Sequence, residues 1–354
     1  MTTAIRWWPH TDDPQVASYR LRCLQIVDAL KRQGLDAGIH HERDVPPAVL
    51  VLSKRYDARS LDAAQALRTR AGTRLVLDLC DNHFHVDNSD PVLLQRASRL
   101  REAVCTVDQV VASSVALAEV VVAEGAPPDR ITVIPDATEP PFEPRGLARW
   151  AQPRAEWRLA RLHRALQRSG LPPARRLLWF GNHGSAGAEG GMADLLRIRD
   201  VLHEAHRQAP LSLTVISNHA GRFAELCAGW TLPAFYLPWH AHSFSRAARL
   251  HGAAVIPVGL NPFTRCKTNN RVATALLHGL NVIADAIPSY AEFAACAVLD
   301  DWPRGLGPYL DDAAQRAADI EAGRRLLAQR YSLDAVAASW RALVARAAAS
   351  GGSE

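Results

Sequence analysis

Cysteine is scarce and shows no pattern in this chain of 354 residues. The six cysteines lie far apart without a Cys-x-x-Cys pair, so the spacings typical of structural zinc sites are absent. A chain of this length also needs no disulfide framework to hold its core together. We therefore expect reduced, mostly buried thiols in a cytoplasmic protein.

Long apolar segments are missing as well. No run reaches the length of a membrane span. The N-terminal sequence lacks the cationic region and apolar core of a signal peptide, so we expect none. Trp7 and Trp8, together with arginine-rich helices elsewhere, are compatible with peripheral contact to the inner face of a membrane.

No block of basic residues is present either. The net charge is +5 and the isoelectric point is about 9.0, but the arginines are spread along the chain. A nucleic-acid polymer needs a concentrated basic stripe, so this distribution argues against such a partner. It favours small anionic ligands or loose contact with an anionic membrane surface.

What the chain does contain is a regular alternation of short apolar runs and amphipathic helical segments. This alternation is typical of a parallel sheet covered by helices on both faces. The expected strands are 5–8, 37–40, 49–53, 74–78, 109–113 and 131–135, then 177–180, 213–216, 234–239, 253–257 and 282–284. The expected helices are 16–33, 60–71, 91–104, 114–124, 154–168, 192–208, 222–228, 244–251, 306–331 and 333–349.

The length suffices for two domains, and the pattern predicts an α/β protein with two Rossmann-like domains. We expect the first domain at 1–140, because the proline-rich segment 140–144 interrupts the alternation. A linker and an arginine-rich helix fill 141–175, the second domain covers 176–331, and a terminal helix follows at 332–354. The halves show no sequence repetition, so no duplication is inferred.

The stretch 266–285 is the strongest candidate site in the second domain. Lys267, Asn269, Asn270 and Arg271 stand at the expected start of a helix, where backbone N–H groups and the helix dipole favour a phosphate. Lys267 and Arg271 are four residues apart and would project from one helix face. The alternative is a solvated basic first turn without a ligand.

Polar residues after the other strands form further candidates, because ligands bind at the carboxyl ends of strands in such sheets. Asp81 and His83 are placed to orient or deprotonate a hydroxyl; equally, they satisfy loop backbone. With Asp78 and His85 they form no recognised metal spacing, and we expect no metal.

A glycine-rich loop follows the first strand of the second domain, with glycines at 181, 184, 187, 190 and 191. Glycines allow close approach of backbone to a phosphate, although the spacing is not Gly-x-Gly-x-x-Gly; a loop without a ligand is the alternative. In the first domain, Ser18 and Arg20 open a helix and are candidates for an anionic acceptor, whereas Arg22 is expected on a solvated flank.

Several motifs resemble the GT-B glycosyltransferases of the GT4 type. Ile131-Thr-Val-Ile-Pro135 matches the family's Ile-Thr-Val-Ile-Pro-Asn-Gly strand, with Asp136 replacing Asn. Lys267-x-Asn269-x-Arg271, followed by Gly279-Leu-x-Val-Ile-Ala, resembles a variant of the family's donor motif. The segment from Tyr331 resembles the terminal helix that crosses back onto the first domain. The resemblance covers nearly the whole chain and implies two Rossmann-like domains facing across a cleft.

The resemblance also implies a function. Such enzymes bind a nucleotide-diphosphate sugar mainly with the second domain and the acceptor with the first, retain the anomeric configuration and need no metal or other cofactor. Lys267 and Arg271 would then hold the diphosphate and stabilise the leaving group. The other donor-binding positions would be Gly181, Asn182, His183, Gly184, Asn218, Trp239, His240, Asn269, Asn270 and Thr274.

Two departures from the family pattern are visible. The acidic pair Glu-x7-Glu falls on Cys266 and Thr274, so the carboxylate that accepts the ribose hydroxyls is replaced by a hydroxyl. No arginine or lysine lies between Gly181 and Leu195, where the family places an arginine. A non-catalytic GT-B subunit that binds a sugar nucleotide or a partner is therefore the alternative to an active transferase, and a sugar-nucleotide epimerase is a third. The sugar, the base and the acceptor (a saccharide, a lipid-linked or a small molecule) are not encoded in these motifs.

Overall fold

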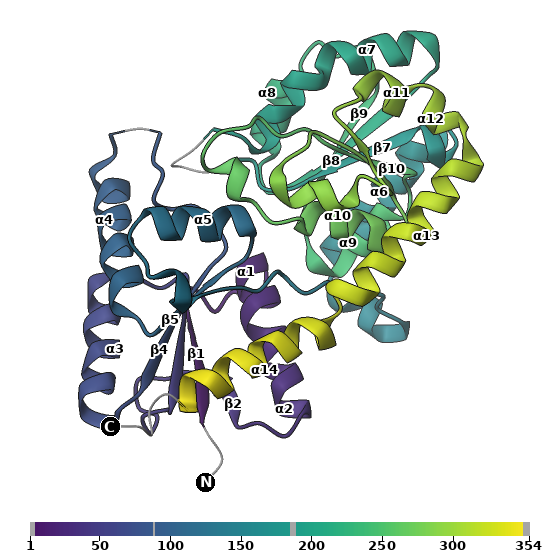
Figure 1. The fold of residues 1–354 in the computed structure, drawn as a ribbon. Helices are drawn as coiled ribbons and strands as arrows, with labels where there is room; N and C mark the ends of the chain where they lie inside the picture. The colour runs from purple at the N-terminus through teal and green to yellow at the C-terminus, as the bar shows by residue number, and fades with distance from the viewer. Residues whose placement is uncertain (1–3, 88, 185–188, 350–354) are drawn as a thin grey trace. The chain divides into compact units, whose positions relative to one another are not determined.

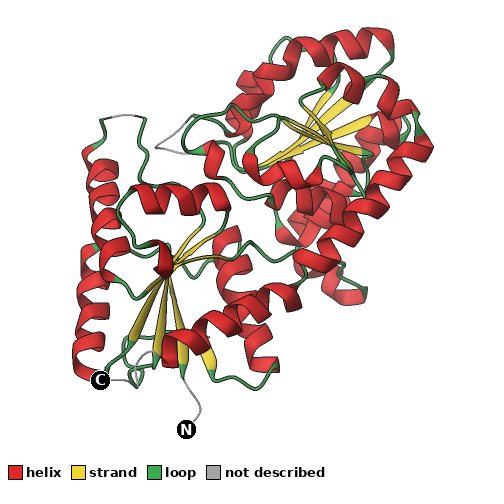
Figure 2. Ribbon diagram, in the orientation of Figure 1, coloured by secondary structure: helices red, strands yellow, loops and turns green. Residues whose placement is uncertain are grey.

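The structure, a computed structural model, describes residues 4–87, 89–184 and 189–349. Its internal contacts divide the chain into two compact units. Unit 1 consists of Met1–Glu139, Arg265–Thr268 and Ala328–Glu354, and unit 2 of Pro140–Thr264 and Asn269–Leu327. Each unit is built around one parallel sheet with helices packed against it (Figures 1 and 2).

The sheet of unit 1 has the strand order β2-β1-β3-β4-β5-β6, and all its neighbours pair in parallel. Its strands are β1 (Ile5–Pro9), β2 (Ala37–Ile39), β3 (Val49–Ser53), β4 (Arg74–Leu79), β5 (Gln109–Ala112) and β6 (Ile131–Val133). Because successive side chains point to opposite faces, Trp7 and Trp8 lie in two different core clusters.

The helices of unit 1 cover both faces of this sheet. They are α1 (Ala17–Tyr19), a π-helical segment (Arg20–Leu24), α2 (Gln25–Arg32), α3 (Ala58–Ala71), α4 (Pro91–Thr106), α5 (Val115–Ala123) and α14 (Leu333–Ala349). Figure 1 shows α14 beside α2, and the Trp7 and Trp340 rings meet edge to face with their centroids 5.5 Å apart. The last helix of the chain thus completes the core of the first sheet.

The sheet of unit 2 has the order β12-β11-β10-β7-β8-β9, which is the doubly wound Rossmann arrangement. Its strands are β7 (Arg176–Phe180), β8 (Ser212–Ser217), β9 (Ala234–Pro238), β10 (Ala253–Ile256), β11 (Asn281–Ala284) and β12 (Val298–Leu299). Five of them match predicted strands to within a few residues. The two-residue edge strand β12 was not predicted, because so short a run leaves no periodic signal.

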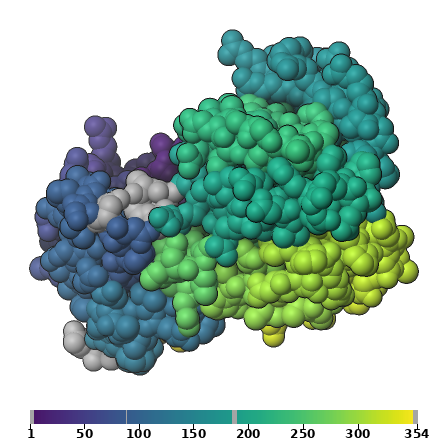
Figure 3. Space-filling model, turned by 90° about the horizontal axis from the view of Figure 1, so that it is seen from above, coloured from purple at the N-terminus to yellow at the C-terminus, as the bar shows by residue number. Residues whose placement is uncertain are grey.

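The helices of unit 2 are α6 (Pro153–Arg168), α7 (Arg199–Gln208), α8 (Ala220–Leu226), α9 (Ala241–Ala248), α10 (Asn270–Leu277), α11 (Trp302–Leu306), α12 (Pro308–Asp311) and α13 (Ala313–Arg330). α13 runs on into unit 1 at Ala328. The arginine-rich α6 packs on α9 and β9 through a leucine face. A Cβ at Gly323 of α13 would lie 2.8 Å from Leu276, so the two helices touch there, and Figure 3 shows these yellow and green segments side by side.

Two predicted helices differ from the structure. The helix expected at 192–208 begins as a 3₁₀ segment, Gly191–Ile198, and becomes α-helical only from Arg199. The helix expected at 306–331 is two helices, α12 and α13, because Asp312 leaves the helical backbone conformation with φ −83° and ψ 87°. Gly307 and the proline after it separate α12 from the preceding α11. Within the residues described, no helix combines the length and apolarity that crossing a membrane requires.

Candidate functional site

The two sheets each have a point where the strand order reverses, and ligands of doubly wound sheets bind outside the carboxyl ends of the strands there. In unit 2 this point lies between β7 and β10, which pair only at Ala253–Leu177 and Ala254–Leu178. In unit 1 it lies between β1 and β3. The candidate residues of each unit are described around its own reversal point.

Unit 2 carries the predicted glycine loop directly after β7. Ser217 Oγ donates to the carbonyl of Gly181 at 2.8 Å, and the backbone N–H of His183 donates to Asn218 Oδ1 at 3.0 Å. Asn182 accepts a bond from the N–H of Gly184 at 3.3 Å. Gly181, Asn182, His183, Gly184 and Asn218 therefore come together in one loop cluster at the carboxyl ends of β7 and β8.

Gly191 closes this loop. Its φ of +79° lies in the left-handed region, and a Cβ would stand 2.9 Å from backbone atoms of Asn182 and Gly184. The N–H of Met192 donates to the carbonyl of His183 at 3.1 Å, which ties the two ends of the loop together. Gly187, also counted in the predicted loop, lies outside the described residues.

The basic stretch does not form one helix face. α10 begins at Asn270, whereas Lys267 stands before it in a segment without regular secondary structure and belongs to unit 1. The prediction that Lys267 and Arg271 project from a common helix face is therefore wrong. The physical reason lies in the preceding segment, where Ser114 Oγ donates to the carbonyl of Cys266 at 2.9 Å and Thr268 Oγ1 donates to Asp136 at 3.0 Å, both within unit 1.

Arg271 lies at the reversal point of unit 2. Its guanidinium is 5.9 Å from the centre of the Trp179 ring, within cation–π range, and it is hydrogen-bonded to Tyr290. A Cβ at Gly181 would lie 3.6 Å from Arg271 Nη1, so this cation stands directly beside the glycine loop. Among the residues that the structure describes, no carboxylate forms an ion pair with it.

Asp194 holds the loop segments around that point. Its carboxylate accepts the N–H of Gly259 at 3.0 Å, and the N–H of Gly191 also donates to it. Burial raises the pKa of Asp194, and the backbone bonds and the nearby Arg271 oppose that rise. We infer that Asp194 is an internal anchor of the loops rather than a reacting group.

The polar residues of α10 make short-range contacts. Asn269 is buried and its amide donates to Glu292 Oε1 at 3.2 Å, whereas the Thr274 hydroxyl donates to Asn270 Oδ1 at 3.5 Å. Thr274 sits one helical turn after Asn270, at the position where the family resemblance leads one to expect a carboxylate. Its hydroxyl is a single weak donor and acceptor there.

Trp239 and His240 follow β9, the edge strand of the sheet. The N–H of Trp239 donates to the carbonyl of Ser217 at 2.8 Å. His240 caps α9, because its Nδ1 accepts the N–H of His242 at 3.1 Å, and burial lowers its pKa. The sheet order places these two residues beyond β8, further from the reversal point than the glycine loop.

In unit 1, Asp81 lies between two ammonium groups. Lys54 Nζ is 2.6 Å from Oδ2 and Lys267 Nζ is 2.5 Å from Oδ1, so two of the chain's three lysines contact one carboxylate. Burial disfavours the charged form, but Lys267 and Lys54 outweigh it and hold the pKa of Asp81 well below its usual range. A carboxylate so stabilised is a poor proton acceptor, which disfavours Asp81 as a general base.

His83 lies in the same cluster and is neutral. Burial lowers its pKa to about 3, with Lys54 and Arg96 adding to the effect and Asp81 opposing it. Its Nδ1 shares a short hydrogen bond with the Tyr56 hydroxyl, and burial raises the pKa of that tyrosine. A neutral imidazole donates or accepts a hydrogen bond at the remaining ring nitrogen, which suits the orientation of a hydroxyl.

Arg22 is buried, so its expected solvated position is wrong. It is 1% exposed and forms a bidentate ion pair with Asp78, with Nη2 at 2.6 Å from Oδ1 and Nε at 3.1 Å from Oδ2. It also contacts Asp136 at 2.9 Å. The π-helical turn Arg20–Leu24 lies over these carboxylates and directs the guanidinium into them. The two partners stand 56 and 114 residues away, and sequence periodicity cannot identify contacts of that kind.

The acceptor candidates Ser18 and Arg20 lie on the outer part of that helix. Arg20 Nε is 2.5 Å from Glu139 and its Nη1 donates to the carbonyl of Pro14.

Trp7 and Trp8 are 0% and 8% exposed. Because both rings are core residues, the expectation that they contribute to a membrane-facing surface is wrong.

A basic pocket of about 480 Å³ opens at the reversal point of unit 1. Its walls come from the ends of β1 and β3 and from one face of α4. The residues that line it are His10, Lys54, Arg55, Tyr56, Asp57, His83, Val92, Gln95, Arg96 and Arg99. We call this the β1–β3 pocket; neither Ser18 nor Arg20 lines it.

The described part of the chain contains no group of three or more His, Cys, Asp or Glu side chains placed as metal ligands. Asp78 is taken up by Arg22, and His85 contacts Asp87 in an exposed loop, away from Asp81. Asp78, Asp81, His83 and His85 are close in sequence, but these contacts direct Asp78 and His85 to other partners.

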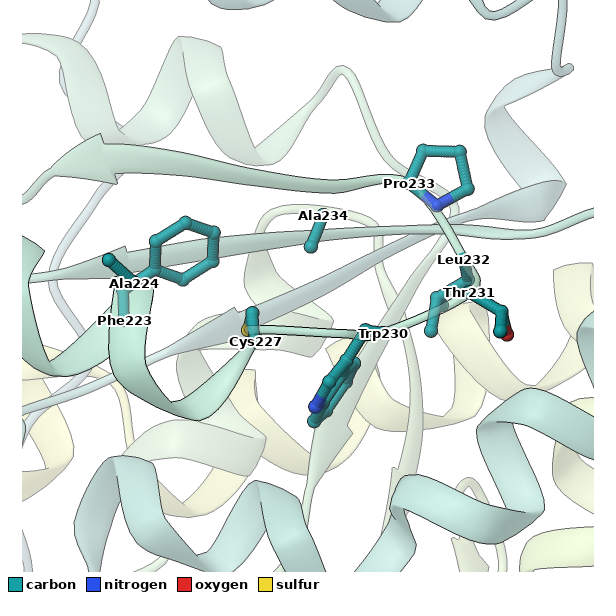
Figure 4. A pocket seen from close by; sticks show the side chains of 8 residues that line it. All are labelled: Phe223, Ala224, Cys227, Trp230, Thr231, Leu232, Pro233 and Ala234. Atoms are coloured by element: carbon teal, nitrogen blue, oxygen red, sulfur yellow. The ribbon is translucent and has the colours of Figure 1, made fainter.

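A second pocket, of about 380 Å³, lies in unit 2 between α8 and the start of β9 (Figure 4). Phe223, Cys227 and Trp230 are among the residues that line it. Burial raises the pKa of the Cys227 thiol to about 11, so that thiol is unreactive at neutral pH. The pocket stands at the amino end of β9, the opposite end from that at which such sheets bind ligands. We assign it no function.

Sequence reasoning missed several residues that define these sites. Trp179, Tyr290 and Asp194 surround Arg271, and each comes from a segment expected to be structural. Arg96 and Arg99 line the β1–β3 pocket from α4. Two arginines three residues apart on a predicted helix lie on the same helix face, and this spacing could have identified them as a candidate site.

No family model matches this chain, and no curated protein matches it. Similar solved structures include sucrose-phosphate synthase from Thermosynechococcus elongatus, with 13% identity, a TM-score of 0.68 and coverage of 98% of this chain and 100% of that one. HepE of Anabaena, solved with UDP and glucose, has 12% identity, a TM-score of 0.66 and coverage of 97% and 99%. WaaG, a glycosyltransferase of lipopolysaccharide biosynthesis, has 14% identity, a TM-score of 0.58 and coverage of 93% and 97%.

These similarities extend over nearly the whole length of each chain, and at such identities they establish the fold. The protein has the GT-B fold, with two parallel six-stranded Rossmann-like sheets. The predicted fold class, and the resemblance to GT-B glycosyltransferases at the level of the fold, are confirmed.

Proposed function

We propose that this protein is a glycosyltransferase that moves a sugar from a nucleotide-diphosphate sugar to an acceptor hydroxyl, with retention and without a metal or another cofactor. Unit 2 binds the donor and unit 1 the acceptor. The support is the GT-B fold, the similarity to glycosyltransferases, one of which is solved with UDP-glucose, and the charge arrangement of the described residues.

One observation carries the proposal: Arg271 stands beside the glycine loop with its guanidinium facing no carboxylate at ion-pair distance in the described chain. A glycine loop, which lets a phosphate approach the backbone closely, and a guanidinium together match a diphosphate. The arginine that the family places after this loop is absent from the sequence, and Arg271 supplies a cation at the same loop from α10.

In the proposed reaction, the bond between the anomeric carbon and the diphosphate oxygen breaks, and a bond to the acceptor oxygen forms. The diphosphate leaves with the electron pair, and the acceptor proton passes to it. Arg271 stabilises the charge that develops on the leaving group. Lys267 brings a second cation, which Asp81 holds in place in unit 1, and His83 orients the acceptor hydroxyl.

The remaining donor residues have supporting roles. Gly181, Asn182, His183 and Gly184 form the surface against which the diphosphate lies. Asn218 and the Asn182 side chain fix this loop by accepting the N–H groups of His183 and Gly184. Asn269 and Asn270 hold the start of α10, and Thr274 contacts the ribose. Trp239 and His240 lie on the side of the base.

A non-catalytic GT-B protein is the second candidate, and Thr274 favours it. A hydroxyl in place of the ribose-binding carboxylate weakens donor binding, because a charge-assisted hydrogen bond is roughly twice as strong as a neutral one. Binding without turnover would identify this alternative.

The test is a thermal-shift panel of UDP, GDP, ADP and dTDP, followed by an assay of sugar-nucleotide turnover with and without EDTA. A nucleotide at about one hundred times its Kd stabilises the fold by about 2.7 kcal/mol, a shift of several degrees. We expect one nucleotide to raise the melting temperature and EDTA to leave turnover unchanged. No shift with any nucleotide, together with no turnover of the sugar nucleotides, would contradict the proposal.

Arg271→Ala provides the site-specific arm. The shift should disappear in this variant while the melting temperature without ligand falls by only a few degrees. The variant loses the contact with Trp179 and the hydrogen bond to Tyr290, but no ion pair within the described chain. Arg325→Ala, at an exposed ion pair on α13, is the matched control and should keep the full shift.

We also propose that this cytoplasmic enzyme touches a membrane through the surface around residues 147–161 of unit 2. Leu147, Trp150 and Trp157 are 90%, 67% and 56% exposed, and the Arg161 guanidinium lies 5.0 Å from the Trp157 ring. Exposed tryptophans among arginines suit an anionic bilayer surface. Phosphatidylglycerol vesicles should co-sediment the protein, and Trp150→Ala/Trp157→Ala should abolish this; equal pelleting with pure phosphatidylcholine vesicles would refute an electrostatic contact.

A further inference from the structure

The β1–β3 pocket is built where a doubly wound sheet binds ligands, and His83 is the one lining residue that the sequence motifs identified. It joins His10 after β1, Lys54–Asp57 after β3 and Arg96 and Arg99 on α4. Its volume of about 480 Å³ lies in the range of small-molecule sites. These observations place a half-open polar site in unit 1.

We propose that the β1–β3 pocket binds a phosphate monoester carried by the acceptor, with Arg96 and Arg99 as its principal ligands. The identification of this ligand as the acceptor rests on the proposed glycosyltransferase function. The binding of a phosphate monoester does not, and it is tested separately.

Arg96 and Arg99 are the cations in the pocket without a partner. The structure gives neither an ion pair nor a hydrogen bond to any other described residue, and Arg96 Nε is buried without an acceptor. A buried N–H without a partner is rare in folded proteins and calls for an acceptor. One turn apart on α4, the two guanidiniums face the same pocket and can chelate one tetrahedral anion.

Lys54 and Arg55 add positive charge from the opposite wall and are held rigidly. Arg55 donates to the carbonyl of Pro9 at 2.8 Å and to Ser60 Oγ at 3.0 Å, and its guanidinium stacks 4.9 Å from the Trp8 ring. Lys54 has a φ of +51°, a conformation that costs a non-glycine residue about 1 kcal/mol. Such strain is typical of residues that the surrounding structure holds in place for a function.

The charge balance of the walls decides the class of ligand. Four cationic side chains line the pocket, but Lys54 is paired with Asp81 at 2.6 Å, so Arg55, Arg96 and Arg99 carry the surplus. Asp57 is the one carboxylate among the lining residues, and its oxygen accepts the N–H of Ser60 at 3.0 Å. A dianion neutralises this surplus better than the single charge of a carboxylate does. Arginine pairs in particular match phosphate oxygens in a bidentate manner.

The histidines of the pocket complete it without adding charge. Burial lowers the pKa of His10 to about 4 and that of His83 to about 3, so both rings are neutral at pH 7. Neutral imidazoles and Gln95 offer hydrogen bonds to hydroxyl groups. The pocket thus combines a charged end for the phosphate with neutral polar groups for the rest of an acceptor.

A phosphate monoester can be part of a soluble molecule or of a lipid headgroup, and the experiment separates the two. Glycerol 3-phosphate is titrated calorimetrically as the soluble probe, and phosphatidylcholine vesicles with phosphatidic acid serve as the membrane probe. Each is measured with the wild type, Arg96→Ala/Arg99→Ala, Arg271→Ala and the control Arg101→Ala. Arg101 lies on the same helix but pairs with Glu124 outside the pocket.

We expect at least one probe to bind at least tenfold more weakly to Arg96→Ala/Arg99→Ala than to the wild type, with Arg101→Ala and Arg271→Ala unaffected. Loss of glycerol 3-phosphate binding assigns a soluble acceptor, and loss confined to the vesicles assigns a lipid headgroup. No binding by the wild type, or equal binding by the double variant, overturns the proposal.

The same measurements distinguish failure of the pocket from failure of the proposed function. If no nucleotide binds but glycerol 3-phosphate binding still depends on Arg96 and Arg99, the glycosyltransferase proposal fails and the phosphate pocket stands. Because the two arginines have no partners in the described chain, the double variant should fold, which a thermal melt of that variant confirms.

Discussion

The two units share one architecture but prepare their reversal points in different ways. Unit 2 places a glycine loop there, with positive φ at Gly190 and Gly191 and one arginine beside it. Unit 1 places Lys54, a non-glycine residue with positive φ, and several cations held by carboxylates, carbonyls and an aromatic ring. The first arrangement lets an anion approach the backbone closely beside one guanidinium, and the second offers side-chain charge.

This difference assigns different ligands to similar sheets. A loop without side chains lets an extended diphosphate approach the backbone closely. A pocket lined by rigid cations selects a compact anionic group by charge and geometry. If the two sites are independent, a substitution in one unit should leave ligand binding in the other unit unchanged.

The largest effect should come from the buried ion pairs of unit 1. Arg22→Ala leaves Asp78 and part of Asp136 without their partner, which should destabilise the unit by about 3–5 kcal/mol or prevent folding. Urea unfolding measures the loss. Arg20→Ala, which breaks a more exposed pair two residues away, should cost at most about 1 kcal/mol; equal losses would mean that burial does not set the difference.

Lys267→Ala should separate activity from stability. Loss of a cation that acts on the leaving group should reduce turnover at least a hundredfold, about 3 kcal/mol of barrier. Lys54 remains on Asp81, so the melting temperature should change by only a few degrees. Lys31→Ala, at the exposed third lysine on α2, is the matched control, and unchanged turnover in Lys267→Ala would rule out its proposed role.

Lowering the pH should reduce the stability of unit 2, because His251 is buried as a neutral ring. Burial lowers its pKa from 6.5 to about 4, and the ring contacts Ala247 and Thr214. In the unfolded chain His251 is protonated below about pH 6.5, whereas in the folded protein it stays neutral until about pH 4. The free energy of unfolding therefore decreases as the pH falls from about 6.5 toward 4, by up to about 3 kcal/mol. Urea unfolding at pH 7 and pH 5 measures this. His251→Gln should flatten the dependence, and an unchanged slope would mean that other groups cause it.

The smallest effect concerns the glycine loop itself. Gly191→Ala introduces a Cβ 2.9 Å from backbone atoms at positive φ, and we expect a loss of about 2 kcal/mol together with weaker nucleotide binding. Gly72→Ala in unit 1 has a similar φ but no atom within 4 Å, so it should cost only about 1 kcal/mol. If both variants lose the same stability, the packing of the glycine loop has no special role.

Much of the fold was predictable because the strands are continuous apolar runs. Val49–Ser53 and Arg74–Leu79 are buried on both faces, and such runs stand out against the amphipathic helices around them. The points at which helices are interrupted were harder to predict. The segment after Trp302 has a helical composition, and only Gly307 and Pro308 mark where it breaks.

The site was predictable only in part, because its charges are arranged by long-range contacts. Lys267 and Arg271 stand four residues apart in sequence, but the chain between them passes from unit 1 to unit 2. Arg22 stands in a segment whose polar residues are typical of a surface helix. Its burial depends on Asp78 in β4 and on Asp136 in the loop after β6. A pattern of neighbouring residues cannot identify ion-pair partners that are so distant in the sequence.

The central claim is that unit 2, through Arg271 and the glycine loop, binds the nucleotide donor. Hydrogen exchange of the whole protein with and without the nucleotide from the thermal-shift panel tests it most directly. We predict slower exchange in the backbone amides of Gly181–Gly184 and of the first turn of α10, and no such change in Arg271→Ala. Protection confined to unit 1, around the β1–β3 pocket, would contradict the assignment.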